Sequence, residues 1–485
     1  MNDLYVTTSI PYVNGAPHLG HALEVVHADV LGRQRRLRGA RARVQSGTDD
    51  HALKNLTAAR AAGVPVADLV ARNGDRFAAL VDLLGASVDA FVRTSSHPGH
   101  ADAVREVWRR CAASGDLYRR SYRGLYCGGC EEFVAAAACP EHPGGVDEVV
   151  ETNWFFRLSR YADRLAALVT SGDLDVVPAA RRNEVLGFLA GGVDDVSVSR
   201  PAARAGGWGV PVPDDPTQVV YVWFDALVNY LSGLGWPGAA SPWWFGATER
   251  VHVVGKGITR FHAVLWPAVL LSAGLPLPDR VLVHDYLTVD GAKIAKSGAQ
   301  AAGPADLATR FGIDALRWWL VREPALLSTT DFMVERLVAA HDQDLANGIG
   351  NLVARTVTPA RGRTVSPAAD VPLSRLAASL PDRVDESLAR YDLRAAAVAV
   401  TDVVAEAGRF LGAEEPWRLA RRADAGDTSA GARCDAVLGT LLDVCRVVTR
   451  ELSPFVPAGA ERLGAALDGV DGAGVAFPRI GGARA

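Results

Sequence analysis

Two histidines three residues apart, His18 and His21, stand in the segment His-Leu-Gly-His. They follow a run of residues typical of a β-strand and open a run typical of a helix, so both imidazoles lie at a helix N-terminus. The free N–H groups and the dipole of a helix favour anions at that end, and Gly20 lets a ligand come close to the backbone. Imidazoles placed there can donate hydrogen bonds to a phosphate during nucleotidyl transfer. Ordinary capping or surface histidines are the alternative interpretation of the pair.

Lysine is rare in this chain and therefore informative. Of the 51 basic residues only four are lysines, Lys54, Lys256, Lys293 and Lys296, and the others are arginines. Where arginine supplies general positive charge, the remaining lysines mark places that need a compact and flexible ammonium group. Lys293 and Lys296 stand in one glycine-bounded segment, Gly-Ala-Lys-Ile-Ala-Lys-Ser-Gly. Two mobile ammonium groups in such a loop suit the pyrophosphate part of ATP, although the segment taken alone favours an exposed turn.

A third set of residues has the spacing of metal ligands. Cys127-Gly-Gly-Cys130 is followed by Cys139-Pro-Glu-His142. Two ligand pairs, each with two intervening residues and joined by a short loop, indicate a tetrahedral Cys₃His zinc site rather than unpaired thiols. Because all four ligands come from the protein, we expect one structural Zn²⁺ with no open position for catalysis. Structural zinc supplies ~10–16 kcal/mol of apparent binding energy in small modules, and this segment has few large apolar residues to replace that energy.

The elements around these residues predict an α/β fold. Strands are predicted at Leu4 to Ile10 and at Arg43 to Ser46, with a helix from Leu19 to Leu37 between them. This order begins a doubly wound domain with a parallel sheet, whose ligands bind at the carboxyl ends of the strands. The same alternation returns later, with strands at 251–254 and 280–283 around a helix at 262–271.

Composition excludes several classes of protein. Of the 485 residues 49% are hydrophobic and 22% charged, as in globular domains, and no stretch reaches the ~18 apolar residues of a membrane span. The N-terminus lacks the features of a signal peptide, and six cysteines are too few for a disulfide scaffold. We therefore expect a cytoplasmic protein with no membrane partner. The net charge is −4, but six arginines within residues 33–43 could supply the local positive surface that an RNA needs.

The ordered motifs resemble those of the class I aminoacyl-tRNA synthetases, whose signatures read His-Ile-Gly-His and Lys-Met-Ser-Lys-Ser. Within that class the chain resembles the methionyl enzymes of the short bacterial type with one zinc knuckle. The shared segments run in order from Thr7–Tyr12 through Gly47–Asp49, Tyr126–Cys127, Val222–Ala226 and Phe311–Arg317 to Glu415–Trp417.

The resemblance implies five parts. They are residues 1–115 and 216–300 for the two halves of a Rossmann-like catalytic domain, 116–215 for an inserted zinc-binding domain, 301–345 for a stem-contact region with the lysine loop at its start, and 346–485 for an α-helical anticodon-binding domain. A monomer is implied as well.

The resemblance also implies a methionine–tRNA ligase that uses ATP with Mg²⁺. L-Methionine would form methionyl-adenylate with release of pyrophosphate, and the 3′ end of tRNA(Met) would then take the methionyl group. The implied catalytic residues are His18, His21, Lys293 and Lys296, and the implied ATP contacts add Gly20, Gly255 and Gly257.

Two further sets of residues follow from the same resemblance. Asp49 would hold the methionine ammonium, and the thioether would lie among Ile10, Tyr12, Trp223, Ala226, Tyr230, Ile258 and His262. A soft sulfur favours such aromatic surroundings. Asn351, Arg355 and Trp417 would contact the anticodon, since an aromatic side chain can stack on an unstacked base and Asn and Arg can read base edges.

Five positions depart from the family pattern, and they concentrate around ATP rather than methionine. Gly257 stands where an aspartate associated with the ATP ribose is usual, and Ile294 and Ala295 replace a methionine and a serine. Ala52 and Gln300 replace a glycine and an asparagine. These changes predict weaker use of ATP with unaltered specificity.

Three alternative functions remain at the level of sequence. A leucine, isoleucine or valine enzyme is disfavoured because the chain has no room for the editing domain of those enzymes. A paralogue that makes an aminoacyl-adenylate for a small-molecule acceptor would fit the altered ATP positions, but the three anticodon residues oppose it. A non-catalytic tRNA-binding paralogue is opposed by the intact histidine and lysine pairs.

Overall fold

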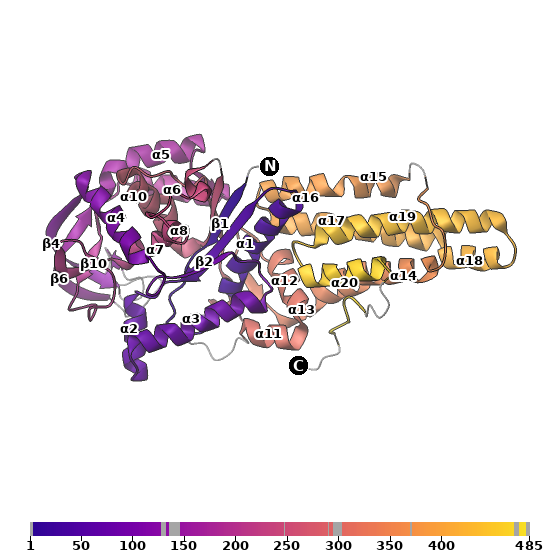
Figure 1. Cartoon of the computed structure of the whole chain (residues 1–485), viewed down its shortest axis with the longest axis horizontal. Helices are drawn as coiled ribbons and strands as arrows, with labels where there is room; N and C mark the ends of the chain where they lie inside the picture. Colours follow the sequence, from indigo (N-terminus) through magenta and orange to yellow (C-terminus); the bar gives the residue numbers. More distant parts are fainter. Residues whose placement is uncertain are drawn as a thin grey trace. The chain divides into compact units, whose positions relative to one another are not determined.

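The computed structural model describes residues 3–127, 132–134, 146–246, 248–289, 291–293, 303–368, 371–469 and 475–481. These residues form two compact units, the first built mainly from the chain before residue 287 and the second mainly from the chain after it (Figure 1). A membrane span would require a long and uniformly apolar helix, and the helices of the described ranges include none.

A six-stranded parallel sheet lies at the centre of the first unit, in the order β3-β2-β1-β12-β13-β7. Every residue of β1 is buried, as expected for a parallel strand covered on both faces. The strand order reverses at β1, whose neighbours are β2 and β12, and sheets of this kind bind ligands outside the carboxyl ends at such a point. The strands are β1 (Leu4–Thr8), β2 (Ala42–Thr48), β3 (Ala90–Arg93), β7 (Asp175–Val177), β12 (Glu249–Gly255) and β13 (Arg280–His284).

The helices of this unit largely follow the sequence predictions. The predicted helix from residue 19 to 37 is confirmed as α1 (Leu19–Leu37). The predicted helix at 262–271 begins instead with a π-helical turn, η3 (Phe261–Leu265), and continues as α10 (Trp266–Ser272). The other helices are α2 (Leu53–Ala62), α3 (Val66–Leu83), α4 (His100–Ala113), α7 (Val222–Leu227), α8 (Asn229–Ser232), α9 (Pro242–Phe245) and the 3₁₀ turns η1 (Leu158–Tyr161) and η2 (Lys256–Ile258).

The inserted region contains two small antiparallel sheets, in the orders β5-β4-β6-β8 and β10-β11-β9. In the chain between β6 and β8, α5 (Ala162–Ser171) and α6 (Ala179–Ala190) flank β7, which pairs in parallel with β13. The range expected for the insertion therefore includes an edge strand of the central sheet, because a strand of three residues is too short to show in composition. The remaining strands are β4 (Leu117–Cys127), β5 (Glu132–Val134), β6 (Val146–Phe156), β8 (Val196–Ser197), β9 (Ser199–Pro201), β10 (Pro211–Val212) and β11 (Asp215–Val220).

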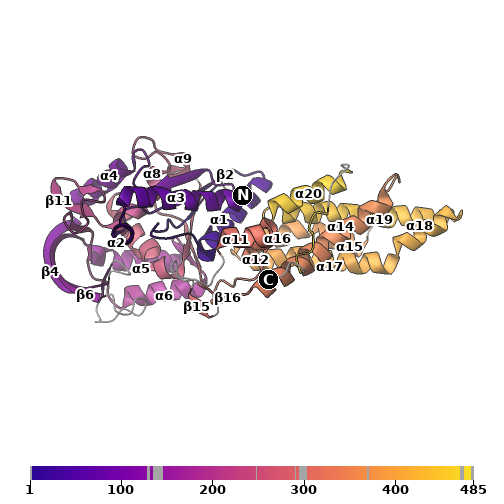
Figure 2. The ribbon, with the colours of Figure 1, turned by 90° about the horizontal axis from the view of Figure 1, so that it is seen from below.

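The second unit is mainly helical, as its sequence predicts. Figures 1 and 2 show α14 (Asn351–Ala360), α17 (Leu393–Glu414) and α19 (Thr428–Leu452) packed alongside one another. A short sheet, β15-β14-β16, precedes them. The other elements are β14 (Leu287–Val289), β15 (Ala292–Lys293), β16 (Thr330–Phe332), α11 (Pro304–Phe311), α12 (Ile313–Arg322), α13 (Val334–Ala340), the π-helical segment η4 (His341–Gly350), α15 (Pro372–Ala378), α16 (Leu380–Ala389), α18 (Pro416–Asp424) and α20 (Pro457–Leu467).

One shared motif, Phe311–Arg317, has a structural role in this unit. The buried Arg317 guanidinium donates to the carbonyls of Phe455 at 2.8 Å and Pro454 at 3.1 Å. Asp314 pairs with Arg462 of α20 at 2.5 Å. The motif therefore ties α12 to the last helical hairpin of the described chain.

Candidate active site

The two histidines of the first motif cap α1 reciprocally. The Gly20 backbone N–H donates to His18 Nδ1 at 3.1 Å, and the His18 backbone N–H donates to His21 Nδ1 at 3.0 Å. The rings stack with centroids 3.7 Å apart, and a Cβ on Gly20 would lie only 3.0 Å from the His18 ring. Because both Nδ1 atoms accept hydrogen bonds, each neutral ring carries its proton on Nε2. The pair therefore presents two N–H donors away from the helix backbone.

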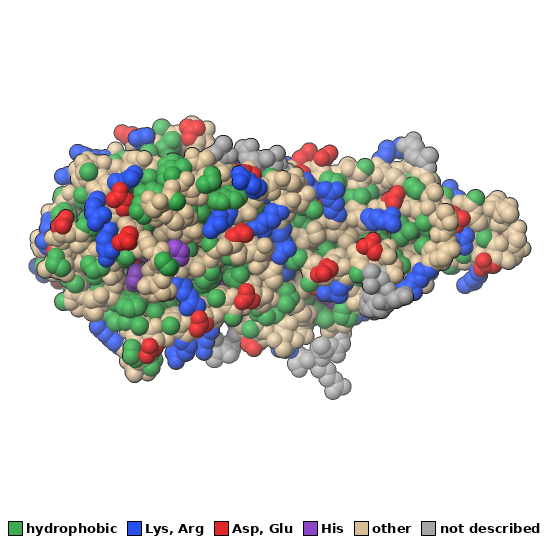
Figure 3. Space-filling model, viewed as in Figure 1, with side chains coloured by type: hydrophobic (Ala, Val, Ile, Leu, Met, Phe, Trp, Pro, Cys, Tyr) green, Lys and Arg blue, Asp and Glu red, His purple; other side chains and the backbone are tan. Residues whose placement is uncertain are grey.

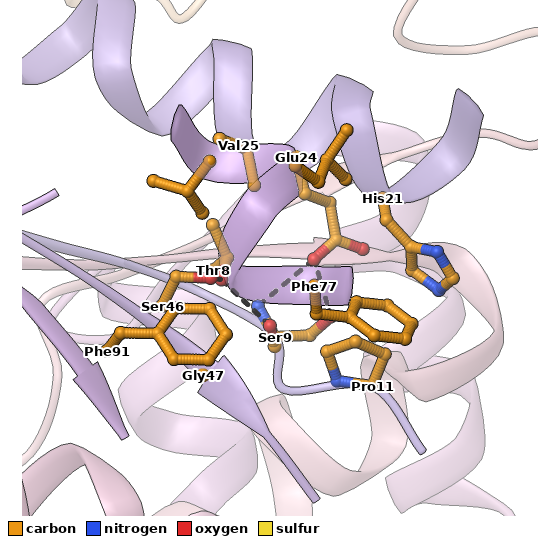
Figure 4. Close-up of a pocket in the computed structure, with 12 residues that line it drawn as sticks. Thr8, Ser9, Pro11, His21, Glu24, Val25, Ser46, Gly47, Phe77 and Phe91 are labelled. Carbon is orange, nitrogen blue, oxygen red and sulfur yellow. Dashed lines mark hydrogen bonds between the residues drawn. The ribbon is translucent and has the colours of Figure 1, made fainter. Parts of the chain in front are cut away.

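Glu24 lies one turn further along α1 and joins three elements. Its Oε2 accepts from the Ser9 backbone N–H at 3.0 Å and from the Ser9 hydroxyl at 2.5 Å, and its Oε1 lies 3.1 Å from His284 Nε2. Burial opposes a charge on His284, but the Glu24 carboxylate raises the pKa of that imidazole above its usual value. Figure 4 shows Glu24, Ser9 and His21 around one pocket of the first unit. Its apolar side includes Phe77, which contacts the His21 ring edge-on at 5.0 Å.

The structure brings together most of the side chains predicted to bind methionine. Tyr12 and Asp49 form an isolated parallel bridge where β1 and β2 end. The Tyr12 and Trp223 rings lie 6.1 Å apart, and Trp223 stacks on Phe261 at 3.9 Å and meets His262 edge-on at 6.3 Å. The π-helical turn η3 places Phe261 and His262 against Trp223, and such turns often occur at functional sites.

A buried hydrogen-bonded chain fixes the protonation of His262. The Ile258 carbonyl can only accept, so the Nδ1–H of His262 donates to it at 3.0 Å, and Nε2 accepts from the Tyr230 hydroxyl at 2.8 Å. Burial lowers the pKa of His262 to about 4 and raises the pKa of Tyr230. Both groups are therefore neutral near pH 7 and act as fixed dipoles rather than charges.

Ile10 and Ala226 occupy tight positions beside this set. A Cβ on Gly47 would lie 3.1 Å from Ile10 Cγ2 and would overlap the backbone of β3, so β2 must carry glycine there. Ala226 is buried, and its carbonyl accepts from Asn229 Nδ2 at 2.6 Å.

A second ionic network lies behind the same residues. Asp225 accepts from His51 Nδ1 at 2.6 Å and from His100 Nε2 at 2.8 Å. Burial opposes its charge, but His51 and His100 hold the pKa of Asp225 well below its usual range, and Asp225 in turn raises the pKa of His51 against the effect of burial. This buried ion pair holds α7, which carries Trp223, against the loop that carries Asp49.

The ends of β12 and β13 form a charged cluster. Lys256 Nζ lies 2.5 Å from Asp285 Oδ1 and 4.5 Å from the centre of the Tyr286 ring. Asp285 is buried and also pairs with Arg181 of α6 at 2.8 Å. Gly255 ends β12 and Gly257 follows in η2, so two of the three glycines predicted to contact ATP lie at this edge of the sheet.

Two of the predicted anticodon residues meet within the second unit, and the third lies one turn away. Asn351 and Arg355 are exposed one helical turn apart on α14. The Arg355 guanidinium lies over the Trp417 ring, 4.8 Å from its centre. Glu415 adopts a left-handed conformation (φ 43°), which turns the chain from α17 into α18 and positions Trp417 in the first turn of α18.

Several predicted site residues lie outside the described residues. They are Cys130, Cys139, His142 and Lys296, together with the side chain of Lys293, whose backbone is in β15. Cys127 is buried at the end of β4, opposite the first residue of β6. Elsewhere in the described chain, no cluster of three or more His, Cys, Asp or Glu side chains is arranged to hold a metal.

Basic side chains do not form one continuous patch on the face shown in Figure 3, because acidic side chains lie among them on both units. Many arginines are paired; Arg33 with Asp29 and Arg36 with Asp89 are examples from the arginine-rich segment. That segment therefore serves the stability of the first unit at least in part, which the count of charges alone did not show.

Among the contributors that were not predicted, three differ in how visible they are in the sequence. Glu24 could have been suspected, because it is an acidic residue within the apolar run of α1, one turn after His21. Asp225 lies inside the shared segment Val222–Ala226, but only its neighbours Trp223 and Ala226 were assigned a role there. Phe261 precedes His262, and nothing in its local sequence distinguishes it from a core residue.

Comparison with known proteins matches the chain to the family model described as tRNA synthetases class I (M), over residues 4–144 and 142–357. A methionine–tRNA ligase of Brucella suis biovar 1 (strain 1330) is 38% identical over 479 residues, covering 95% of this chain and 90% of the relative. One of Mycobacterium leprae (strain TN) is 37% identical over 486 residues, covering 96% and 89%.

A solved structure, methionyl-tRNA synthetase of Mycobacterium tuberculosis in complex with methionyl-adenylate, superimposes with a TM-score of 0.91 at 34% identity. The match covers 99% of this chain and 100% of that one.

Proposed function

The chain belongs to the methionyl-tRNA synthetases of class I and is a methionine–tRNA ligase, and from this premise we propose how its residues divide the reaction. ATP and L-methionine form methionyl-adenylate and pyrophosphate, and the methionyl group then passes to tRNA(Met). We assign the phosphates to the N-terminus of α1, methionine to the pocket around Trp223, and the anticodon to α14 and α18.

The reciprocal histidine cap is the observation that carries this assignment. Two Nε2–H groups, held by backbone hydrogen bonds to Nδ1, can donate to the α-phosphate as the methionine carboxylate attacks it. The rings need no rearrangement, because capping has already fixed their tautomer and orientation. Lys293 and Lys296 would hold the departing pyrophosphate, and Mg²⁺ would accompany ATP. No protein nucleophile is needed, so catalysis rests on position and electrostatics.

The methionine pocket combines one charge with neutral walls. Asp49 is buried at the end of β2 and would receive the ammonium group of the substrate. Trp223, the neutral His262 and Tyr230 would surround the thioether, a contact that aromatic rings favour. A pocket of this kind discriminates by only ~1–3 kcal/mol per methylene, so leucine and norleucine should be weak substrates rather than excluded ones.

The second unit would read the anticodon. Arg355 already lies over the Trp417 ring, so the two side chains would offer an unstacked base an aromatic ring with a positive charge beside it. Asn351, one turn before Arg355, would add hydrogen bonds to a base edge. The helical range 346–485 is the corresponding domain in this assignment.

We also assign a single structural zinc to Cys127, Cys130, Cys139 and His142. The described neighbours fit it: β4 ends at the buried Cys127 and pairs with the start of β6, so the two strands that flank the other three ligands are held together. The metal would stabilise the inserted region and takes no part in the reaction. A cytoplasmic monomer completes the proposal.

Methionine-dependent exchange of pyrophosphate into ATP tests the assignment of the histidines. His21→Asn keeps an acceptor at the Nδ1 position, and so keeps the cap, but removes the Nε2–H donor. His21→Ala removes both. We expect a loss of about 10²–10³ in exchange rate in both variants, with a lower melting temperature in the alanine variant alone. An asparagine variant that retains the parental exchange rate would show that His21 acts only as a cap.

A further inference from the structure

Gly257 has no side chain at the position that the family resemblance associates with the ATP ribose, but the structure shows another residue in that space. A Cβ built on Gly257 would lie under 3.0 Å from the Tyr286 hydroxyl oxygen and 3.5 Å from Tyr286 Cζ. The hydroxyl therefore stands where a side chain of residue 257 would begin.

The position of this hydroxyl suits a ligand. Gly257 follows β12 by two residues and Tyr286 follows β13 by two residues, and Gly255 and His284 are paired in these adjacent parallel strands. Both residues thus lie at the carboxyl edge of the sheet, where α/β folds bind their ligands. Gly257 is exposed and Tyr286 is half-buried, so the hydroxyl lies beside an exposed stretch of backbone.

The Tyr286 ring is held in place from one face. The Lys256 ammonium lies 4.5 Å from the ring centre and is itself fixed by Asp285 at 2.5 Å. The Asp285 side chain is only 4% exposed and has a second cation, Arg181, at 2.8 Å. The buried Asp285 carboxylate keeps the Lys256 ammonium beside the ring, because a buried carboxylate is costly to separate from its cations. The cation contact favours this ring position, so a side chain at residue 257 would have to displace the phenol from it.

We propose that the Tyr286 hydroxyl binds a ribose hydroxyl of ATP in place of the carboxylate that residue 257 lacks, with Lys256 and Asp285 as positioning residues. This rests on the proposed function of the site. A phenol O–H both donates and accepts hydrogen bonds, so it can meet a sugar hydroxyl. It is a weaker partner than a carboxylate, so we expect a working enzyme with reduced ATP affinity.

The proposal reverses an expectation from sequence alone. The departures from the family pattern suggest that aspartate at residue 257 would improve the use of ATP. The structure predicts the opposite for Gly257→Asp alone, because the new Cβ would collide with the Tyr286 hydroxyl and displace the group that serves the ribose.

Deoxy analogues of ATP test the contact directly. In pyrophosphate exchange the parent should prefer ATP over 2′-deoxy-ATP or 3′-deoxy-ATP, and in Tyr286→Phe this preference should fall about tenfold for at least one analogue. The KM for ATP should rise while the KM for methionine stays constant. A purely space-filling tyrosine would leave the preference against both analogues unchanged, and that result would overturn the proposal.

A paired substitution gives a second, independent test. In Gly257→Asp/Tyr286→Phe the hydroxyl is gone and a carboxylate takes its place, so discrimination against the deoxy analogue should return. Gly257→Ala/Tyr286→Phe is the matched control, since it relieves the same overlap without a polar group and should remain impaired. Equal activity of the two double variants would contradict a ribose contact at this position.

Different results would contradict the proposed function and the assignment of Tyr286. A parent without methionine-dependent exchange would contradict the proposed function. A parent with exchange, but with identical ratios of ATP to deoxy-ATP use in the parent and in Tyr286→Phe, would overturn only the assignment of Tyr286.

Discussion

Acidification should destabilise the first unit through His262. The side chain is 1% exposed and accepts a hydrogen bond from Tyr230 at 2.8 Å in its neutral form. Its pKa in the folded protein is lowered to about 4, mainly because burial disfavours the charge, whereas an unfolded histidine titrates near ~6.5. Between these two values the unfolded chain binds more protons than the folded one. Stability from this group is therefore complete above about pH 6.5 and declines as the pH falls toward 4.

The size of the effect follows from the two pKa values. A difference of about 2.5 pKa units corresponds to roughly 3 kcal/mol, of which roughly 2.5 kcal/mol should be lost at about pH 4.5. Other groups contribute over the same range, including His252, whose pKa burial lowers well below its usual value and whose ring centre lies 6.0 Å from that of His262. Comparison with a variant that cannot titrate at this position removes their contribution.

Urea unfolding at a series of pH values is the appropriate assay. The free energy of unfolding of His262→Gln should be lower than that of the parent near pH 7.5 but should fall less steeply on acidification, by roughly 2.5 kcal/mol at about pH 4.5. Two parallel pH profiles would refute the reasoning.

His284→Gln is a control of opposite sign. The pKa of His284 is raised by Glu24 against the effect of burial, so its stabilising contribution is present below about pH 6.5 and is lost as the pH rises. This variant should therefore lose more stability than the parent when the pH falls from about 7.5 to 6.

Three other outcomes are expected. Elemental analysis should find about one zinc per chain, and Cys130→Ser should lose it and lower the melting temperature; a fully active preparation without metal would contradict the assignment. Trp417→Ala should weaken tRNA charging at limiting tRNA by roughly tenfold, since stacking on one base is worth ~1–3 kcal/mol, while pyrophosphate exchange without tRNA stays unchanged. Equal loss of both activities would point to a folding defect instead. Lys296→Ala should reduce exchange by about 10² or more, because it removes a charge that meets pyrophosphate, and a variant with most of its activity would show that this loop does not bind the nucleotide.

Local pattern was sufficient for the elements that begin and end with clear signals. The α1 helix was predicted from residue 19 to 37 and is confirmed, because apolar spacing and the glycine after its end are local features. The strands β1, β2, β12 and β13 were also predicted, because a short run of strand-forming residues is a local feature too. The edge strand β7 was missed, since a three-residue strand acquires its identity only by pairing with β13, more than 100 residues away in the chain.

The sequence by itself determined the family, the order of the motifs and the chemistry available to each, because residue type and short spacing carry that information. The tertiary structure decided which distant groups meet: Asp225 with His51 and His100, and Tyr286 with Gly257. Burial shifts a pKa only once a side chain is enclosed. The Tyr286 hydroxyl occupies the space beside Gly257 only once β12 and β13 are adjacent. No local pattern contains either quantity, so both the neutral state of His262 and the occupied space beside Gly257 became visible only in the folded chain.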